Sequence, residues 1–218
     1  MAKDTLTSKY FNNKVIFNSP KEYTIGDFVL DYQVAAGLTG AMDGSVIDLA
    51  LVHSDSGSSQ RALKARLSVR HEFLAQEAVF EVEQNEGSYS CLQVEYVVLK
   101  PQHTAQGLGI RMFAHQAYMA KTVGIHQIFL RAVADASYNG AYTWPRYGFQ
   151  ALMDVPDQAK FATLFPGVKD LAELMSTEQG RAWWKSKAFT LSMCFDLNEP
   201  ICTDTLEAYM AEKGVQIV

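Results

Sequence analysis

The chain has 218 residues, enough for one domain with a sizeable hydrophobic core. A content of 48% hydrophobic and 20% charged residues excludes a disordered or fibrous protein. There are 19 Lys and Arg against 24 Asp and Glu, and this net charge of −5 argues against non-specific binding of nucleic acid.

The first half of the chain reads as strands. Residues 28–33 alternate between apolar and polar, and Gly37, Gly40 and Gly44 are interpreted as turn residues. Further strands, alternating or continuously apolar, are expected at 46–53, 61–69, 78–83 and 92–99. Small polar residues at 54–59 and 85–87 predict tight connections between them. These features predict an antiparallel meander.

The pattern changes after Pro101. Residues 107–123 have helical spacing, and Gly124 suits a helix C-terminus. Residues 128–133 are nearly continuously apolar, as in a buried parallel strand. The remainder predicts helices at 158–165, 169–175 and 179–187, then a strand at 189–197. We expect a single domain over residues 1–218, with a helical insertion at about 151–188.

The junction between strand 92–99 and the following helix is the segment most informative about chemistry. Glycine tolerates positive φ and close approach of a ligand, and the first N–H groups of a helix favour anions. A phosphate cradle is therefore predicted at Gln106, Gly107, Leu108, Gly109, Ile110 and Arg111, where Arg111 adds a fixed positive charge. A tight turn without a ligand would show the same pattern. Neither a P-loop nor a dinucleotide fingerprint is complete here.

Two motifs in this region resemble one known family. Pro101, Thr104, Gly107 and Gly109 resemble motif A of the GCN5-related N-acetyltransferases, and residues 139–149, which end in Gly-Phe, resemble motif B. The resemblance implies an α+β fold, the acyl-CoA N-acyltransferase fold. That fold has a mixed, mostly antiparallel, twisted sheet with a central parallel pair, flanked by helices. The helical insertion before the last strand is unusual for the family.

The resemblance also implies a cofactor, acetyl-CoA, whose pantetheine arm pairs with an open strand edge in this family. That edge corresponds here to Val97, Val98 and Leu99, whose side chains would also serve the core. Thr104 occupies the family's Arg/Gln position. Asn139 would either hydrogen-bond the cofactor or cap a short helix.

The implied reaction is direct transfer of an acetyl group from acetyl-CoA to an amine in a ternary complex. Gln93 falls near the family's usual base, so Glu95, on the same strand face, is the candidate base. Glu81 and Glu83 come next. Trp144 occupies the position of the usual tyrosine acid, so Tyr142 is the candidate acid. Tyr138 and Tyr147 are its alternatives. Each of these residues also has an ordinary structural interpretation, an ion pair or packing.

The acceptor would be a small-molecule amine or a protein Lys or N-terminus. The replacements at Gln93, Thr104 and Trp144 leave a second hypothesis, a catalytically degenerate protein that acts by binding through its inserted helices. Trp183-Trp184 would then be packing or a contact surface. A hydrolase using His71 or His103 is a third hypothesis, but no nucleophile motif accompanies it.

Cys91, Cys194 and Cys202 form no C-x-x-C pair, so we expect free thiols and no metal site. The sequence shows no apolar run of about 18 residues and no secretory signal. These observations favour a cytoplasmic protein that binds neither membrane nor nucleic acid.

Overall fold

The computed structural model describes residues 2–18, 23–25, 28–53, 63–85, 89–135 and 139–217. The chain forms two compact units, residues 1–128 with 210–218 (unit 1) and residues 129–209 (unit 2). The connection predicted at 54–59 lies outside the described residues. Of the one predicted at 85–87, only Asn85 is described, at the end of a strand.

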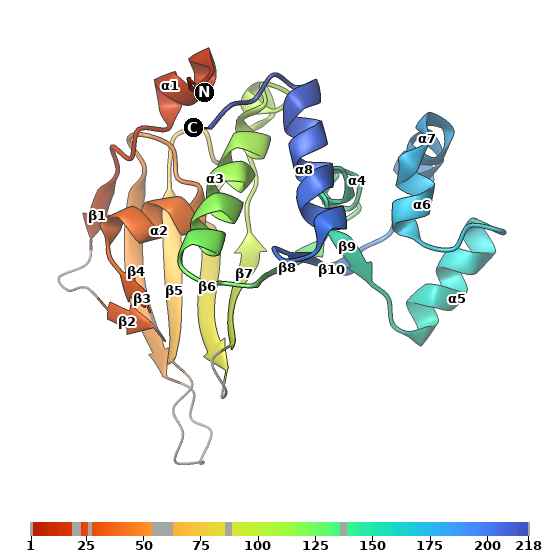
Figure 1. Cartoon of the computed structure of the whole chain (residues 1–218), viewed down its shortest axis with the longest axis horizontal. Helices are drawn as coiled ribbons and strands as arrows, with labels where there is room; N and C mark the ends of the chain where they lie inside the picture. The colour runs from red at the N-terminus through yellow and green to blue at the C-terminus, as the bar shows by residue number, and fades with distance from the viewer. Residues whose placement is uncertain are drawn as a thin grey trace. The chain divides into compact units, whose positions relative to one another are not determined.

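Unit 1 is built on a twisted sheet (Figure 1). Its strands, in spatial order, are β1 (Ile16–Asn18), β4 (Val46–His53), β5 (Leu63–Arg70), β6 (Ala78–Asn85) and β7 (Tyr89–Tyr96). Strands β4 to β7 pair antiparallel, which confirms the predicted meander. β1 adds a parallel pair with β4 that the sequence did not predict. A separate hairpin joins β2 (Tyr23–Ile25) to β3 (Phe28–Leu30).

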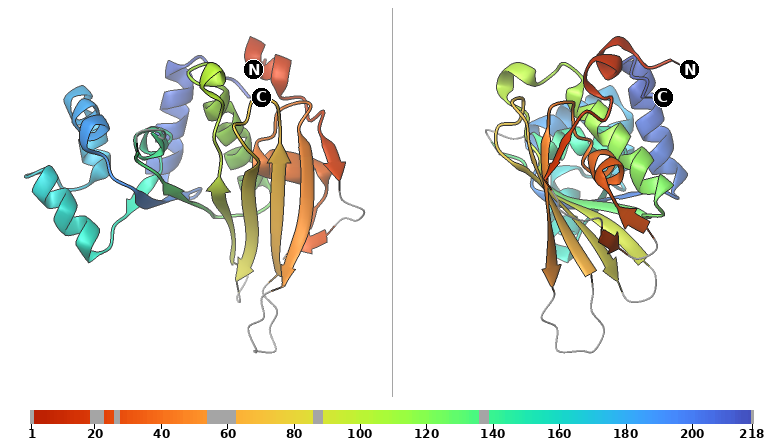
Figure 2. Two further views of the ribbon diagram at one scale, coloured as in Figure 1. Left: turned by 180° about the vertical axis from the view of Figure 1, so that it is seen from behind. Right: turned by 90° about the vertical axis from the view of Figure 1, so that its left-hand side faces the viewer.

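Helices α2 (Tyr32–Thr39) and α3 (Leu108–Thr122) cover one face of this sheet (Figures 1 and 2). The alternation of the strands turns Leu67, Phe80 and Leu92 into the core, where each side chain contributes about 1.5–3 kcal/mol. Helix α3 follows β7 and leads to β8 (Gln127–Ala132), as the predicted strand–helix–strand order requires.

The prediction for residues 31–40 was wrong, because α2 forms there in place of a strand end and turns. Asp31 caps the helix through the N–H groups of Gln33 and Val34. A Cβ on Gly37 would lie 2.6 Å from the Met119 side chain of α3, and one on Gly40 2.1 Å from the Met112 carbonyl oxygen. Gly37 therefore serves helix packing. Gly40, in the left-handed conformation at φ 58°, does end the helix.

Unit 2 holds most of β8 and the elements that follow it, up to residue 209. Its elements are α4 (Gly140–Arg146), β9 (Gln150–Leu152), α5 (Val155–Leu164), α6 (Leu171–Ser176), α7 (Glu178–Lys187), β10 (Leu191–Asp196) and α8 (Pro200–Glu212), whose last residues belong to unit 1. Strands β9 and β10 pair antiparallel. The three predicted helices and the predicted strand after them are thus confirmed, with boundaries shifted by one to three residues.

An aromatic cluster forms the core of the helical insertion. Trp184 is fully buried and its indole N–H donates to the Ala141 carbonyl oxygen at 2.8 Å. Its ring lies within 6.2 Å of three Phe rings, those of Phe161, Phe165 and Phe189. Trp184 is therefore a packing residue, while Trp183 is half-buried beside Phe165. The chain as a whole has the predicted α+β class, with a mixed, mostly antiparallel sheet flanked by helices.

Candidate active site

The predicted cradle is a left-handed turn followed by a long helix in unit 1. The short 3-10 helix at Pro101–His103 leads into a loop in which Ala105 has φ 59° and Gly107 has φ 74°. Helix α3 begins at Leu108 with Gly107 as its N-cap. Left-handed residues of this kind turn successive N–H groups toward one side, an arrangement that suits anions.

Three N–H groups at this point have no partner among the described residues. None of the described residues accepts a hydrogen bond from the N–H of Leu108, Gly109 or Ile110, whereas that of Arg111 is 3.4 Å from the Gly107 oxygen. These N–H groups form the N-terminus of the 15-residue helix α3, which is the positive end of its dipole. The arrangement can bind an anionic group through the backbone alone.

The polar side chains of the loop stabilise the loop itself. The hydroxyl of Thr104 donates to the Pro101 oxygen at 2.8 Å, and the amide of Gln106 donates to the Gln102 oxygen at 2.6 Å. Both residues are exposed. Their predicted contact with a cofactor would thus come from the main chain, with the side chains already engaged.

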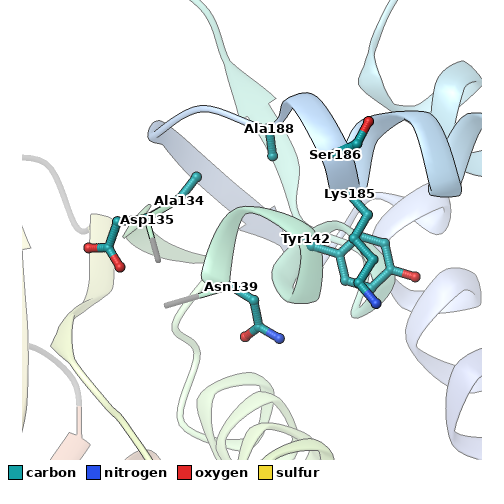
Figure 3. A pocket seen from close by; sticks show the side chains of 7 residues that line it. All are labelled: Ala134, Asp135, Asn139, Tyr142, Lys185, Ser186 and Ala188. Atoms are coloured by element: carbon teal, nitrogen blue, oxygen red, sulfur yellow. The ribbon is translucent and has the colours of Figure 1, made fainter. Parts of the chain in front are cut away.

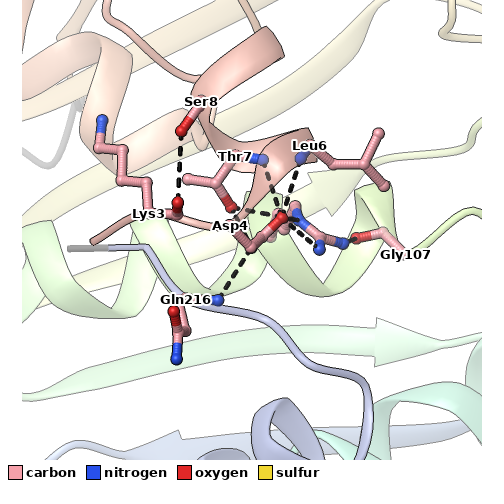
Figure 4. Close-up of polar contacts among 8 residues, drawn as sticks. Lys3, Asp4, Leu6, Thr7, Ser8, Gly107 and Gln216 are labelled. Atoms are coloured by element: carbon pink, nitrogen blue, oxygen red, sulfur yellow. Dashed lines mark hydrogen bonds and ion pairs between the residues drawn. The ribbon is translucent and has the colours of Figure 1, made fainter. Parts of the chain in front are cut away.

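The positive charge predicted for the cradle is engaged elsewhere. Arg111 is only 4% exposed, and its guanidinium pairs with Asp4 at 2.7 Å. Figure 4 shows Asp4 beside Leu6, Thr7 and Gln216. The guanidinium also donates to the Thr7 hydroxyl at 3.2 Å and to the Gly107 oxygen at 2.9 Å. Arg111 therefore holds the cradle from its buried side. Nothing in the spacing of the sequence indicated Asp4, which lies 107 residues away.

The predicted cofactor edge follows β7. The N–H of Ala75 donates to the Val98 oxygen at 2.9 Å, and Leu99 forms an antiparallel bridge with Leu74, so one side of this segment is paired. Backbone groups of Val97 and Leu99 point to the other side, because direction alternates along an extended chain. No described residue bonds to their N–H groups. An extended ligand could pair there.

Glu95 lies at an irregularity of β7. Val79 pairs with Tyr96 while the adjacent Phe80 pairs with Val94, so Glu95 is the extra residue of a β-bulge. Bulges of this kind redirect a side chain and are common near active sites. The Glu95 side chain is exposed.

The alternative carboxylates on this strand face differ from Glu95. Glu81 is 8% exposed and lies 2.5 Å from the Lys64 ammonium. The hydrogen bond to Glu81, aided by the charges of Glu83 and Glu95, raises the pKa of Lys64. A carboxylate engaged in such a pair is a poor base, which leaves Glu95 and Glu83 as the accessible candidates.

Unit 2 contributes a pocket of about 310 Å³ (Figure 3). The pocket brings together Asn139 and Tyr142, which the sequence predicted, with residues it missed. Its lining comprises Ala134, Asp135, Asn139, Tyr142, Lys185, Ser186 and Ala188. Lys185 and Ser186 come from α7, more than 40 residues beyond Tyr142. No sequence signal linked the two segments, although Lys185 directly follows Trp184, the anchor of the helical insertion.

Two cations lie near the ring of Tyr142. The Lys185 ammonium and the Arg146 guanidinium are each 5.5 Å from the centre of its ring. Asp135 is well separated from both Tyr142 and Lys185 in the view of Figure 3. The pocket thus offers an aromatic ring, a hydroxyl and charges of both signs.

The other tyrosines predicted as possible acids are less suited. Burial raises the pKa of Tyr147, and this residue packs edge-on against Trp144. Tyr138 lies outside the described residues. Asn139 is exposed, and its amide oxygen accepts from the Thr143 hydroxyl at 3.3 Å, so no cap bond from its side chain to the α4 backbone is present.

The histidines show no nucleophile. Across the described ranges, no Ser, Thr or Cys side chain is hydrogen-bonded to His71 or His103. His103 stacks on Phe73, with 4.0 Å between the ring centres.

Cys91, Cys194 and Cys202 are buried free thiols, as expected. Within the described part of the chain no three His, Cys, Asp or Glu residues are grouped as metal ligands. No helix in that part is long and apolar enough to cross a bilayer.

Comparison with known proteins finds similarity only among solved structures. No family model and no curated protein matches the sequence. Naa50 from Arabidopsis thaliana, in complex with a bisubstrate analogue, is 11% identical with a TM-score of 0.34, over 40% of this chain and 58% of Naa50. Nourseothricin acetyltransferase is 14% identical with a TM-score of 0.34, over 81% of this chain and 96% of its own.

A GNAT family acetyltransferase from Elizabethkingia anophelis, with acetyl-CoA bound, is 8% identical with a TM-score of 0.33, over 68% of this chain and 97% of its own. At these identities and TM-scores the matches say nothing about the chemistry of this chain.

Proposed function

We propose that this chain, which has the fold of the GCN5-related N-acetyltransferases, binds a coenzyme A thioester and transfers its acyl group to an amine. One observation carries the proposal. Three N–H groups, of Leu108, Gly109 and Ile110, have no partner among the described residues and lie at the positive end of a 15-residue helix. Residues 100–107 connect them to an extended segment in which the N–H groups of Val97 and Leu99 also have no described partner. A ligand with a pyrophosphate and an amide-bearing arm fits this pair of features.

The cofactor roles divide between these two segments. The pyrophosphate of coenzyme A would accept hydrogen bonds from the three N–H groups of the cradle. The pantetheine amides would pair with Val97 and Leu99, whose N–H groups no described residue occupies. Asn139, which the resemblance implies as a contact of the cofactor, stays a prediction. None of these contacts requires a free charged side chain, which is consistent with the engagement of Arg111 by Asp4.

In the proposed reaction the amine nitrogen attacks the thioester carbonyl carbon, so that a C–N bond forms and the C–S bond breaks. Glu95 receives the proton of the amine, directly or through a water molecule. The leaving thiolate takes up a proton, for which the sequence predicts Tyr142 as the donor. Whichever N–H of Val97 and Leu99 the pantetheine arm leaves open would stabilise the oxyanion that develops on the carbonyl oxygen.

The unit 2 pocket suits an amine as acceptor. Asp135 supplies a carboxylate that attracts an ammonium group, and Tyr142 supplies an aromatic ring. The net charge of −5 acts in the same direction at long range. We therefore propose a cationic small molecule or a protein Lys or N-terminus as the acceptor.

Calorimetric titration of the purified chain with acetyl-CoA, repeated with free coenzyme A, tests the proposal. We expect a Kd in the micromolar range for both ligands. Absence of binding would overturn it. Release of the coenzyme A thiol in the presence of a polyamine, an aminoglycoside or a Lys-containing peptide then tests transfer. If acetyl-CoA binds but none of these acceptors causes release of the coenzyme A thiol, the result would favour the catalytically degenerate protein.

A further inference from the structure

A buried polar cluster lies directly behind the cradle. Asp4 caps α1 (Thr5–Tyr10), and its carboxylate accepts from the N–H groups of Leu6 and Thr7 at 2.9 and 3.1 Å. The same carboxylate accepts from the N–H of Gln216 at 2.9 Å and from the Thr7 hydroxyl at 2.7 Å. The Arg111 guanidinium completes the cluster, donating to the Asp4 carboxylate at 2.7 Å. Asp4 thus links segments 4–7, 107–111 and 216.

The charges in this cluster are matched. The side chains of Arg111 and Asp4 are 5% and 14% exposed, and their closest atoms are 2.7 Å apart. Burial alone would raise the pKa of Asp4, but hydrogen bonds from Arg111, Gln216 and Thr7 hold it well below its usual value. A buried ion pair of this kind is costly to break from one side, because the remaining charge loses its partner.

The cluster also fixes the conformation of the cradle. Gly107 caps α3 without any side-chain bond, and its carbonyl oxygen accepts from Arg111 Nη1 at 2.9 Å. A Cβ on Gly107 would lie 2.6 Å from that Nη1 atom, so the guanidinium fills the space that the glycine leaves. The left-handed turn that frees the next three N–H groups is therefore supported from behind by Arg111, which Asp4 holds in place.

We propose that Asp4 and Arg111 are positioning residues that set the affinity of the cradle for coenzyme A without touching it. This inference rests on the proposed function. Since Asp4 acts through Arg111 and Gly107, its loss weakens cofactor binding while the rate at saturating cofactor is retained.

The test compares Asp4→Asn with Asp43→Asn. Asp43 is a matched control, because its carboxylate also holds backbone of the first 14 residues, accepting from the N–H groups of Asn12 and Lys14 at 2.8 and 3.0 Å. Its side chain has no bond to Gly107 or Arg111. We expect the Kd for acetyl-CoA, measured by calorimetry at a temperature where all the proteins are folded, to rise at least tenfold in Asp4→Asn. The rise should stay below threefold in Asp43→Asn. Equal rises in both would overturn the inference, since they would reflect general loss of stability.

A second readout does not depend on the cofactor. Amide hydrogen exchange at Arg111 and Met112, whose N–H groups make the first bonds of α3, should accelerate in Asp4→Asn and not in Asp43→Asn. Unchanged exchange would overturn the inference even if affinity falls. If the unmodified chain binds no acetyl-CoA, the proposed function fails, and the exchange measurement still decides whether Asp4 supports the cradle.

Chemical rescue addresses Arg111 itself. Arg111→Ala leaves a space beside Asp4 and Gly107 that a guanidinium ion fits. We expect acetyl-CoA affinity to be weakened at least tenfold in this variant and to recover at least threefold on addition of millimolar guanidinium chloride, but not of ammonium chloride. Recovery with both salts, or with neither in a variant that circular dichroism shows to be folded, would contradict the positioning role of Arg111.

Discussion

The two units contribute different kinds of binding group. The cradle and strand edge of unit 1 present backbone N–H groups. The polar side chains of the cradle loop bond to the loop itself, and Arg111 pairs with Asp4. The pocket of unit 2 presents side chains, with Asp135, Tyr142 and Lys185 drawn from separate segments. A backbone site depends on the shape of the chain and tolerates many side chains. A side-chain site depends on particular chemical groups. Substitutions should therefore act on the two halves in different ways.

The largest effect is expected for Gly109→Glu. A glutamate in the first turn of α3 favours the helix by about 0.3–1 kcal/mol, yet its carboxylate competes with a phosphate for the same N–H groups. We expect a folded protein whose Kd for acetyl-CoA rises at least a hundredfold, measured by calorimetry. Gly109→Ala is the control and should bind within threefold of the original. Full binding by Gly109→Glu would contradict the backbone cradle.

Asp4→Asn should be the most destabilising of these changes, by about 3 kcal/mol at pH 7, because it leaves Arg111 buried without its partner. The pKa of Asp4 is lowered in the folded state, so its carboxylate stabilises the fold above its unfolded pKa of about 4. This contribution is lost as the pH falls through the folded pKa. Urea unfolding at pH 7, 5 and 3 measures the free energy of unfolding of the original protein and of Asp4→Asn. The difference between the two values should shrink below about pH 4. A difference that does not vary with pH would exclude an ionised Asp4 as its source.

Glu95→Gln tests the one side-chain role in the chemical step that is assigned to unit 1. If Glu95 is the base, kcat should fall about 10²-fold with the Kd for acetyl-CoA unchanged. Glu83→Gln is the control and should retain most of the activity. Glu83 lies on the neighbouring strand β6, and its charge also acts on Lys64. Equal activity of both variants across the pH range would remove Glu95 from the mechanism.

Tyr142→Phe tests the side-chain half in the same way. Removal of the hydroxyl keeps the ring near Lys185 and Arg146, so we expect intact folding and a kcat about tenfold lower. Tyr118→Phe, an exposed tyrosine of α3, is the matched control with no expected effect. A kcat equal to that of the control would assign Tyr142 to the pocket wall alone.

The smallest effect is expected for Ala105→Gly. Ala105 has φ 59°, a conformation that costs a residue with a Cβ about 1 kcal/mol and glycine almost nothing. The gain is offset by the greater freedom of glycine in the unfolded chain, about 0.5–1 kcal/mol. Thermal unfolding should change by less than about 1 kcal/mol and acetyl-CoA affinity by less than twofold. A large loss of affinity would show that the side chain of Ala105 contributes to binding, which would contradict a site built from backbone groups alone.

The sequence by itself determined the order of the longer elements from strand 46–53 to strand 189–197, because alternation and helical spacing are local properties. The three-residue strand β9 was not predicted. The sequence also located the turn before α3, since a left-handed turn before a helix favours glycine at Gly107. It failed at α2, where Gly37 reads as a turn and serves as a contact surface for Met119.

Only the tertiary structure decided which groups meet. Asp4 neutralises Arg111 across 107 positions, and Lys185 reaches Tyr142 across 43. The bulge at Glu95 likewise depends on the register of β6 against β7. These contacts follow from packing between distant segments. Their energies depend on burial and on partners, and neither leaves a periodic trace in the sequence.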